Sequence, residues 1–226
     1  MTSTEFLDAL DALVAEKHLL KHPFYVLWSE GKLTRDTLKE YAISYYPQVA
    51  NFPRYVSGVH AGCEDAGLRQ ELLENLIEEE RGELNHPALW RRFAAALGAG
   101  DGELSAAPRT PEVAAAVASF LAVTHDGETA EGLAGLYAYE SQIPEISKTK
   151  REGLAAFYGI NDEQAVRFFT VHETADVWHR QVEREALGRV ADTPESREKA
   201  LAAARRCLDA LNGALDGVVR ENRLSC

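Results

Sequence analysis

The sequence has 226 residues, of which 46% are hydrophobic and 27% are charged, so it can bury a core and is not a disordered chain. Its 24 basic and 36 acidic side chains give a formal charge of −12, which argues against nucleic acid or anionic membranes as partners. No apolar run approaches the roughly 20 residues that a bilayer span requires. Three scattered cysteines and an acidic first segment, unlike a secretory signal, lead us to expect a cytoplasmic protein.

Helical periodicity runs along almost the whole chain, and no alternating pattern predicts a strand. Pro47 and Pro53 interrupt the second expected helix, which should therefore be kinked or broken. The glycine-rich segment 98–110 is the expected long loop. Short connections predict a single all-α bundle domain over residues 1–226, frayed at its C-terminus. The expected helices are 4–20, a second from a cap at Thr34 or Asp36 toward His60, then 67–84, 88–97, 111–124, 129–143, 145–158, 162–187 and 194–219.

The expected helix 162–187 carries three side chains of the metal-ligand type. At about 100° per residue, His172, Asp176 and His179 share an arc of about 60°. Two imidazoles and one carboxylate with open positions form the set that Fe(II) or Mn(II) takes. A single histidine on an apolar face is more often a satisfied core residue, so this pattern needs support from elsewhere in the chain.

The expected helix 67–84 supplies that support. Glu79, Glu83 and His86 again fall within about 60° on a regular helix. The alternative is a solvated charged face, which we assign to Glu78 and Glu80. The acidic run therefore predicts a second group of ligands beside ordinary surface charges.

Glu140 is the third element of this pattern. It is the only carboxylate between Leu133 and Ile143 in a run of small, aromatic and apolar residues. Burying an unpaired charge there would be too costly, and a pair of metal ions would compensate it. Carboxylates and histidines from three separate helices match a dimetal site in a helical bundle, which activates O₂.

Two arrangements of ligands fit these residues. A ferritin-like site would use Glu83 with His86 and Asp176 with His179, but it leaves His172 surplus and needs a further first-helix glutamate. The second arrangement has Glu-x6-His, a lone Glu, and His-x3-Asp-x2-His on successive helices. It is filled completely by Glu79, His86, Glu140, His172, Asp176 and His179.

The second arrangement resembles the haem-oxygenase-like dimetal oxidases, and in order and spacing it is most similar to their 4-aminobenzoate synthases of folate biosynthesis. The likeness runs over about residues 20–187. It implies a seven-helix bundle, a homodimer, the six ligands above, and two metal ions per chain (Fe/Fe or Mn/Fe). It also implies O₂ as co-substrate and an external reductant. The same superfamily includes pyrroloquinoline-quinone synthases and thiaminase II proteins, which need no iron.

The resemblance also implies that the enzyme consumes its own side chains. Tyr25 stands at the position of the sacrificed tyrosine, Tyr41 at that of a second tyrosine, and Lys150 at that of the amino donor. Phe168 stands where we associate a further tyrosine with the site. From the sequence alone, the two tyrosines could equally be core aromatics, and Lys150 could lie in a solvated basic cluster.

Other functions stay open at this point. The dimetal site could oxidise an external amino-acid or fatty-acid derivative, with Tyr25 as a bystander. A metal-free enzyme of the quinone-synthase type and a non-enzymatic interaction module are the remaining alternatives. Cys63 and Cys207 lie in small-residue and apolar helical contexts, so we interpret them as packing residues rather than nucleophiles.

Overall fold

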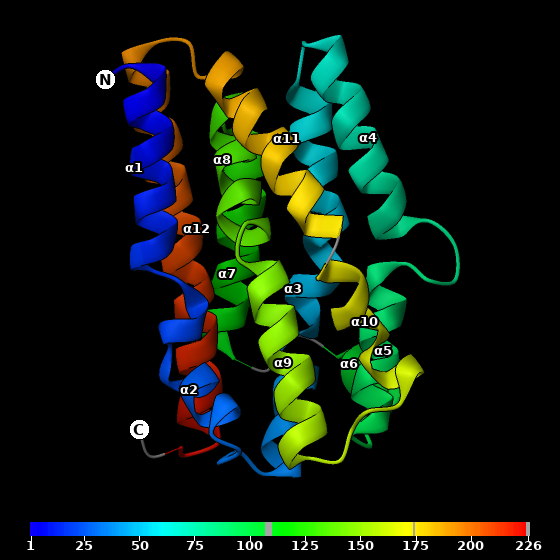
Figure 1. The fold of residues 1–226 in the computed structure, drawn as a ribbon. Helices are drawn as coiled ribbons and strands as arrows, with labels where there is room; N and C mark the ends of the chain where they lie inside the picture. The colour runs from blue at the N-terminus through cyan, green and yellow to red at the C-terminus, as the bar shows by residue number, and fades with distance from the viewer. Residues whose placement is uncertain (107–109, 174, 225–226) are drawn as a thin grey trace.

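The computed structural model describes residues 1–106, 110–173 and 175–224, with the backbone alone for 175–179. The described residues are helical and contain no β-strand, which confirms the all-α class (Figure 1). The helices are α1 (Ser3–Glu16), α2 (Pro23–Ser29), α3 (Arg35–Gly62), α4 (Ala66–Glu80), α5 (His86–Ala96), α6 (Asp101–Leu104), α7 (Pro111–Leu121), α8 (Thr129–Glu140), α9 (Ile143–Phe157), α10 (Glu163–His172), α11 (Ala175–Val190) and α12 (Pro194–Glu221).

The described residues form more separate helices than the seven expected. The expected helix 162–187 is divided into α10 and α11, and the short helix α6 lies inside the segment expected to be a loop. Helix α2 is a separate element because His22 caps it and Pro23 occupies its first turn. Proline starts and side-chain caps are local signals that can make a short segment such as α2 a helix of its own.

Helix α3 is not broken at its prolines, so of the two expected outcomes, a kink or a break, the break is wrong. It runs without interruption from Arg35 to Gly62, with Pro47 and Pro53 inside it. Each proline removes one backbone donor, which by itself weakens a helix. Here α3 packs against α4, α5, α7 and α8. Burial along most of its length outweighs the two lost hydrogen bonds and keeps the helix continuous.

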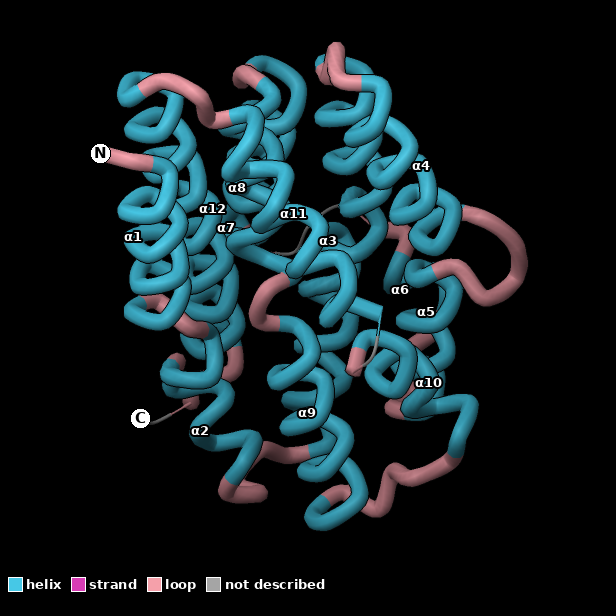
Figure 2. The backbone as a smooth tube through the Cα atoms, turned by 45° about the horizontal axis from the view of Figure 1, so that its top comes forward, coloured by secondary structure: helices cyan, strands magenta, loops and turns pink. Residues whose placement is uncertain are grey.

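The helices lie side by side in a bundle whose long members span its height. Helix α12 packs against α1, α7 and α8, and α10 packs against α5 and α9. Three pairs of consecutive helices follow one another along the bundle, with breaks near its mid-height: α4 with α5, α8 with α9, and α10 with α11 (Figure 1). Figure 2 shows the short connection between α8 and α9 inside the bundle, whereas the α4–α5 loop bulges outward.

Among the described residues, no helix combines the length and apolar character needed to cross a bilayer.

A close approach between α2 and α9 gives a prediction for stability. A Cβ on Gly153 would lie 2.8 Å from Cδ1 and Nε1 of the buried Trp28. Gly153→Ala is therefore expected to lower the free energy of unfolding by about 1–3 kcal/mol through overpacking. Gly213→Ala in α12, where nothing lies within 4 Å, should raise it by roughly 0.5–1 kcal/mol. Urea unfolding followed by circular dichroism measures both, and equal effects would contradict the prediction.

Candidate functional site

The proposed ligands with described side chains all lie at helix ends. Glu79 is the penultimate residue of α4, His86 is the first of α5, Glu140 is the last of α8, and His172 is the last of α10. These are the ends that meet at the mid-height breaks of the bundle (Figure 1). The breaks therefore place chemistry-bearing side chains in the interior.

The turn between α4 and α5 brings Glu79 and His86 together. Helix α4 ends at Glu80, Gly82 adopts a left-handed φ of 78°, and the Asn85 side chain caps α5. The chain is thereby redirected, so that His86 Nδ1 lies 2.7 Å from Glu79 Oε1. Both side chains are buried. The two residues meet as expected, although they do not lie on one helix.

Glu83 does not join them, and the idea that it shares a helical face with Glu79 is wrong. It lies in the exposed loop after α4, and its neighbour Leu84 is 55% exposed. The ferritin-like arrangement, which needs Glu83 as a ligand, loses its first pair. The physical reason is the end of α4 at Glu80, because helical spacing has no meaning beyond it.

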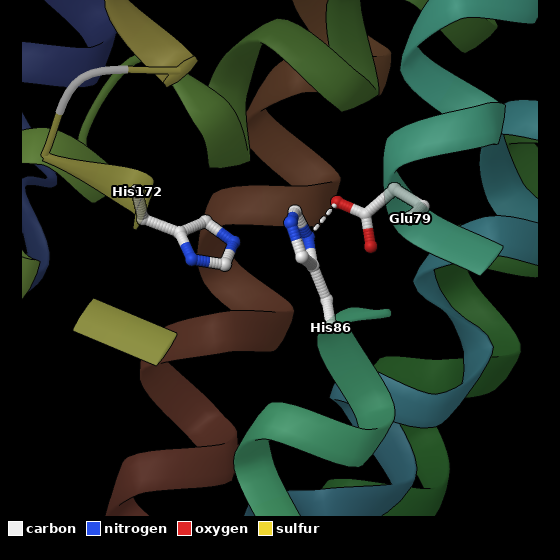
Figure 3. Close-up of side chains that lie close together, drawn as sticks. All are labelled: Glu79, His86 and His172. Atoms are coloured by element: carbon white, nitrogen blue, oxygen red, sulfur yellow. Dashed lines mark ion pairs between the residues drawn. The ribbon is translucent and has the colours of Figure 1, made fainter. Parts of the chain in front are cut away.

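His172 completes a compact cluster with these two residues. Its ring centroid lies 4.1 Å from that of His86, and ligand atoms of Glu79, His86 and His172 lie within 4.8 Å of one another (Figure 3). His172 Nδ1 lies 2.6 Å from the carbonyl oxygen of Phe168. A carbonyl oxygen only accepts, so Nδ1 donates, and Nε2 of neutral His172 carries the lone pair that a metal ion could bind.

The single helix expected over 162–187 is wrong. Helix α10 ends at His172 and α11 begins at Ala175, so the common arc with Asp176 and His179 does not hold. The side chains of Asp176 and His179 lie outside the described residues. Their part in the site stays a prediction from the sequence.

Glu140 lies beside the three-residue cluster rather than within it. It is only 2% exposed, and its Oε1 accepts a hydrogen bond of 3.0 Å from Asn75 Nδ2. Asn75 precedes Glu79 by one turn of α4, so Glu140 faces α4 next to the cluster. The expectation that this carboxylate is buried is confirmed.

The donor set fits a transition-metal ion. Imidazole and carboxylate are the ligands that iron and manganese accept, and the tautomer of His172 is held by a backbone carbonyl, as is usual for a metal-binding histidine. Glu79 and Glu140 are two buried carboxylates in this region, and a bound cation would compensate their charge. The described residues therefore supply several of the ligands that a metal site of this kind needs.

A second cluster joins Tyr25, Tyr41 and Lys150. The Tyr25 and Tyr41 hydroxyls are 3.2 Å apart, and Lys150 Nζ donates to Tyr41 Oη at 2.7 Å. Lys150 is 4% exposed, so the reading of its segment as a solvated basic cluster is wrong for this residue. The side chain of Lys148 is exposed, because the two lysines lie on different faces of α9.

Aromatic rings surround the Lys150 amine. Its Nζ lies 5.1–5.7 Å from the centroids of five rings. Because burial removes the ammonium from water, the pKa of Lys150 falls to about 7. Burial also raises the pKa of the Tyr25 and Tyr41 phenols well above the usual value, so both keep their protons. The five rings belong to Tyr25, Tyr41, Tyr45, Trp90 and Phe169.

Tyr45, Trp90 and Phe169 were not predicted from the sequence. A signal was present for two of them, since Tyr45 follows Tyr41 by one helical turn and Trp90 follows His86 by one turn. Phe169 carries no comparable signal, because apolar aromatics on a buried face are expected in any core.

Phe168 and Trp90 connect the two clusters. The Phe168 ring centroid lies 4.2 Å from that of His172 and 4.9 Å from that of Trp90, which is 5.9 Å from that of Tyr41. Phe168 thus packs directly on the histidine cluster. A thin aromatic layer separates the histidines from the tyrosine and lysine side chains.

The described cysteines are poor nucleophiles. Burial raises the pKa of the Cys63 thiol and raises that of Cys207 to about 12. A thiol needs a lowered pKa and access to react, so both act as packing residues. Cys226 lies outside the described residues.

Comparison with known proteins identifies relatives of this chain. The family described as iron-containing redox enzymes matches residues 39–212. The chain is 45% identical to the 4-aminobenzoate synthase of Nitrosomonas europaea, over 96% of this chain and 92% of the relative. It is 42% identical to that of Chlamydia muridarum, over 95% and 90%. The chain therefore belongs to the family of iron-containing redox enzymes, together with these 4-aminobenzoate synthases.

A solved structure has the same fold at low sequence identity. A TenA homologue from Pseudomonas syringae pv. tomato superposes with a TM-score of 0.82 at 19% identity, over 96% of this chain and 92% of that one. At this identity the likeness concerns the fold alone. It confirms the expected bundle architecture.

Proposed function

We propose that this protein is a 4-aminobenzoate synthase that forms its product from its own Tyr25, with Lys150 as the source of nitrogen. The observation that carries the proposal is the buried contact of Lys150 with Tyr41 and of Tyr41 with Tyr25. The 4-aminobenzoate synthases among its relatives support the choice of product.

The composition of the product supports a tyrosine as its source. The ring carbons and Cβ of a tyrosine side chain account for every carbon atom of 4-aminobenzoate. The Cα–Cβ bond of Tyr25 would break, Cβ would become the carboxyl carbon, and nitrogen would replace the phenol oxygen. The phenol oxygen would leave as water, the carboxyl oxygens would come from O₂ or water, and Cα of Tyr25 would gain a hydrogen and become that of a glycine residue. The Cε–Nζ bond of Lys150 would break to release the nitrogen, and Cε would become an aldehyde. These changes remove six electrons, so two O₂ molecules reduced to water would accept them together with two electrons from an external reductant.

The metal site that we propose contains two ions, Fe/Fe or Mn/Fe. Glu79, His86 and His172 would hold them with Glu140, and the sequence adds Asp176 and His179. When bound, such ions supply the electrons that activate O₂. The buried position of the described ligands keeps bulk water away from this chemistry.

The residues around Tyr25 are placed to accept its phenol proton and to bring an amine close to its ring. Oxidation of a phenol releases the Oη proton, and Tyr41 Oη is the neighbour placed to accept it. Tyr41 in turn contacts Lys150 Nζ, whose pKa of about 7 leaves a neutral amine available as a base. The same neutral amine lies 5.3 Å from the Tyr25 ring centroid, where the new C–N bond is needed.

A single-turnover experiment with isotopes tests the proposal. Protein carrying ¹³C-ring tyrosine and ¹⁵N-lysine is loaded anaerobically with Fe(II) and Mn(II), then exposed to O₂ and a reductant. We expect 4-aminobenzoate that carries both labels, together with a loss of mass in the peptide containing Tyr25. Tyr137→Phe, which alters a buried tyrosine bonded to Asp11 outside the cluster, should keep the yield, and Tyr25→Phe should abolish it.

Unlabelled product, or an unchanged mass of the protein, would refute the proposal that the enzyme consumes its own side chains. Product formed from an added amino-acid or fatty-acid derivative would instead favour the dimetal oxygenase with an external substrate. Product formation without any metal would favour an enzyme of the quinone-synthase type. The cluster of Glu79 with two histidines argues against this last alternative, since an organic substrate does not require it.

A further inference from the structure

Asn75 is a buried polar residue that the proposed reaction does not use. It lies on the buried stripe of α4 with Leu68, Leu72 and Glu79, and it is 4% exposed. Its Nδ2 donates to Glu140 Oε1 at 3.0 Å. An ionised carboxylate only accepts hydrogen bonds, so the amide nitrogen and not the amide oxygen must face Glu140.

The surroundings of Asn75 explain why an amide suits this position. It lines a small cavity together with Glu71 and Glu183. An aspartate at position 75 would stand among three carboxylates and repel Glu140. The neutral amide binds one oxygen of Glu140 and adds no charge to this acidic region.

We propose that Asn75 is a positioning residue that holds Glu140 in the orientation required for metal binding. The inference rests on the proposed function, in which Glu140 is a metal ligand. Asn75 precedes Glu79 by one turn of α4, so the same helix carries a proposed ligand and the support of a second one. Groups that orient a metal ligand in this way commonly change metal affinity by about 10–100-fold when they are removed.

Asn75→Leu tests the inference, because it keeps the branching of the side chain at Cγ and removes the donor. Mn(II) binding to the full-length protein is measured by electron paramagnetic resonance, together with the melting temperature without metal. We expect Mn(II) affinity about 10–100-fold weaker than in the wild type. Gln48→Leu, which alters a buried amide bonded to Tyr55, is the matched control and should change the affinity by less than about twofold.

A second variant keeps the test valid if Asn75→Leu does not fold. Asn75→Ser is smaller and polar, cannot reach Glu140, and should weaken Mn(II) binding in the same way. Wild-type affinity in the folded Asn75 variants, with weaker binding in Glu140→Ala, would overturn the role of Asn75 and leave the metal site standing. Unchanged binding in Glu140→Ala would overturn both the inference and the proposed role of Glu140. A lower melting temperature with unchanged affinity would mark Asn75 as merely structural.

Discussion

His172→Ala is expected to remove most of the iron or manganese that the protein retains, with affinity at least about 100-fold weaker than in the wild type. The reason is the geometry of its ring. Nδ1 is held by the Phe168 carbonyl oxygen, so Nε2 is a preorganised ligand beside Glu79 and His86. Alanine leaves a gap that no other imidazole in the described cluster fills.

Metal content by plasma emission spectrometry, after anaerobic reconstitution with Fe(II) and Mn(II), measures this effect. Glu83→Gln is the control, because Glu83 lies between the proposed ligands Glu79 and His86 along the chain but is exposed. We expect about two metals per chain in the wild type and in this control, as a dimetal bundle site requires. Equal metal content in His172→Ala and the wild type would refute the metal site.

Lys150→Met is expected to abolish 4-aminobenzoate formation while metal content stays at the wild-type level. Methionine fills the space among the same rings but supplies neither nitrogen nor a base. In the wild type, the single-turnover yield should rise as pH increases through about 7, because the neutral amine is the reactive form. A yield independent of pH between 6 and 9, or product from Lys150→Met, would exclude Lys150 as nitrogen source.

The pH dependence of the free energy of unfolding tests the pKa of Lys150 independently. The pKa of Lys150 is about 7 in the folded protein and near 10.5 when the chain is unfolded. Between these values the unfolded state binds more protons, so the free energy of unfolding should rise with pH across this window. The full penalty, present below pH 7, is about 5 kcal/mol at most. Lys150→Met should remove this slope and stabilise the protein at low pH, as urea unfolding at several pH values will show.

Much of the fold could be predicted because its signals are local. The cap at Thr34 and the proline Pro194, which starts the last helix, lie within a few residues of the ends that they define. Apolar spacing then gives the buried face of each helix. The end of α4 was expected at residue 84 rather than at Glu80, and the break after His172 was missed. A regular pattern on both sides of a turn looks the same as an unbroken helix.

The candidate site shows where local reasoning ends. From the sequence, Glu79, His86, Glu140 and His172 could be chosen by residue type and spacing, together with Tyr25, Tyr41 and Lys150 by resemblance. The assumption behind that choice, ligands in register on one helix, was wrong for Glu79 with His86 and for His172 with Asp176. Glu79, His86 and His172 nevertheless lie close together, because the helix ends that carry them meet near the middle of the bundle.

By itself, the sequence determined the helical class, most helix positions and which residue types carry the chemistry. These properties follow from short-range hydrogen bonding and from the periodic burial of apolar side chains. Only the tertiary structure decided that Lys150 is buried among aromatic rings while Lys148 is exposed, and that Asn75 contacts Glu140. Such contacts join residues on different helices, and they depend on how whole helices pack rather than on any neighbouring residue.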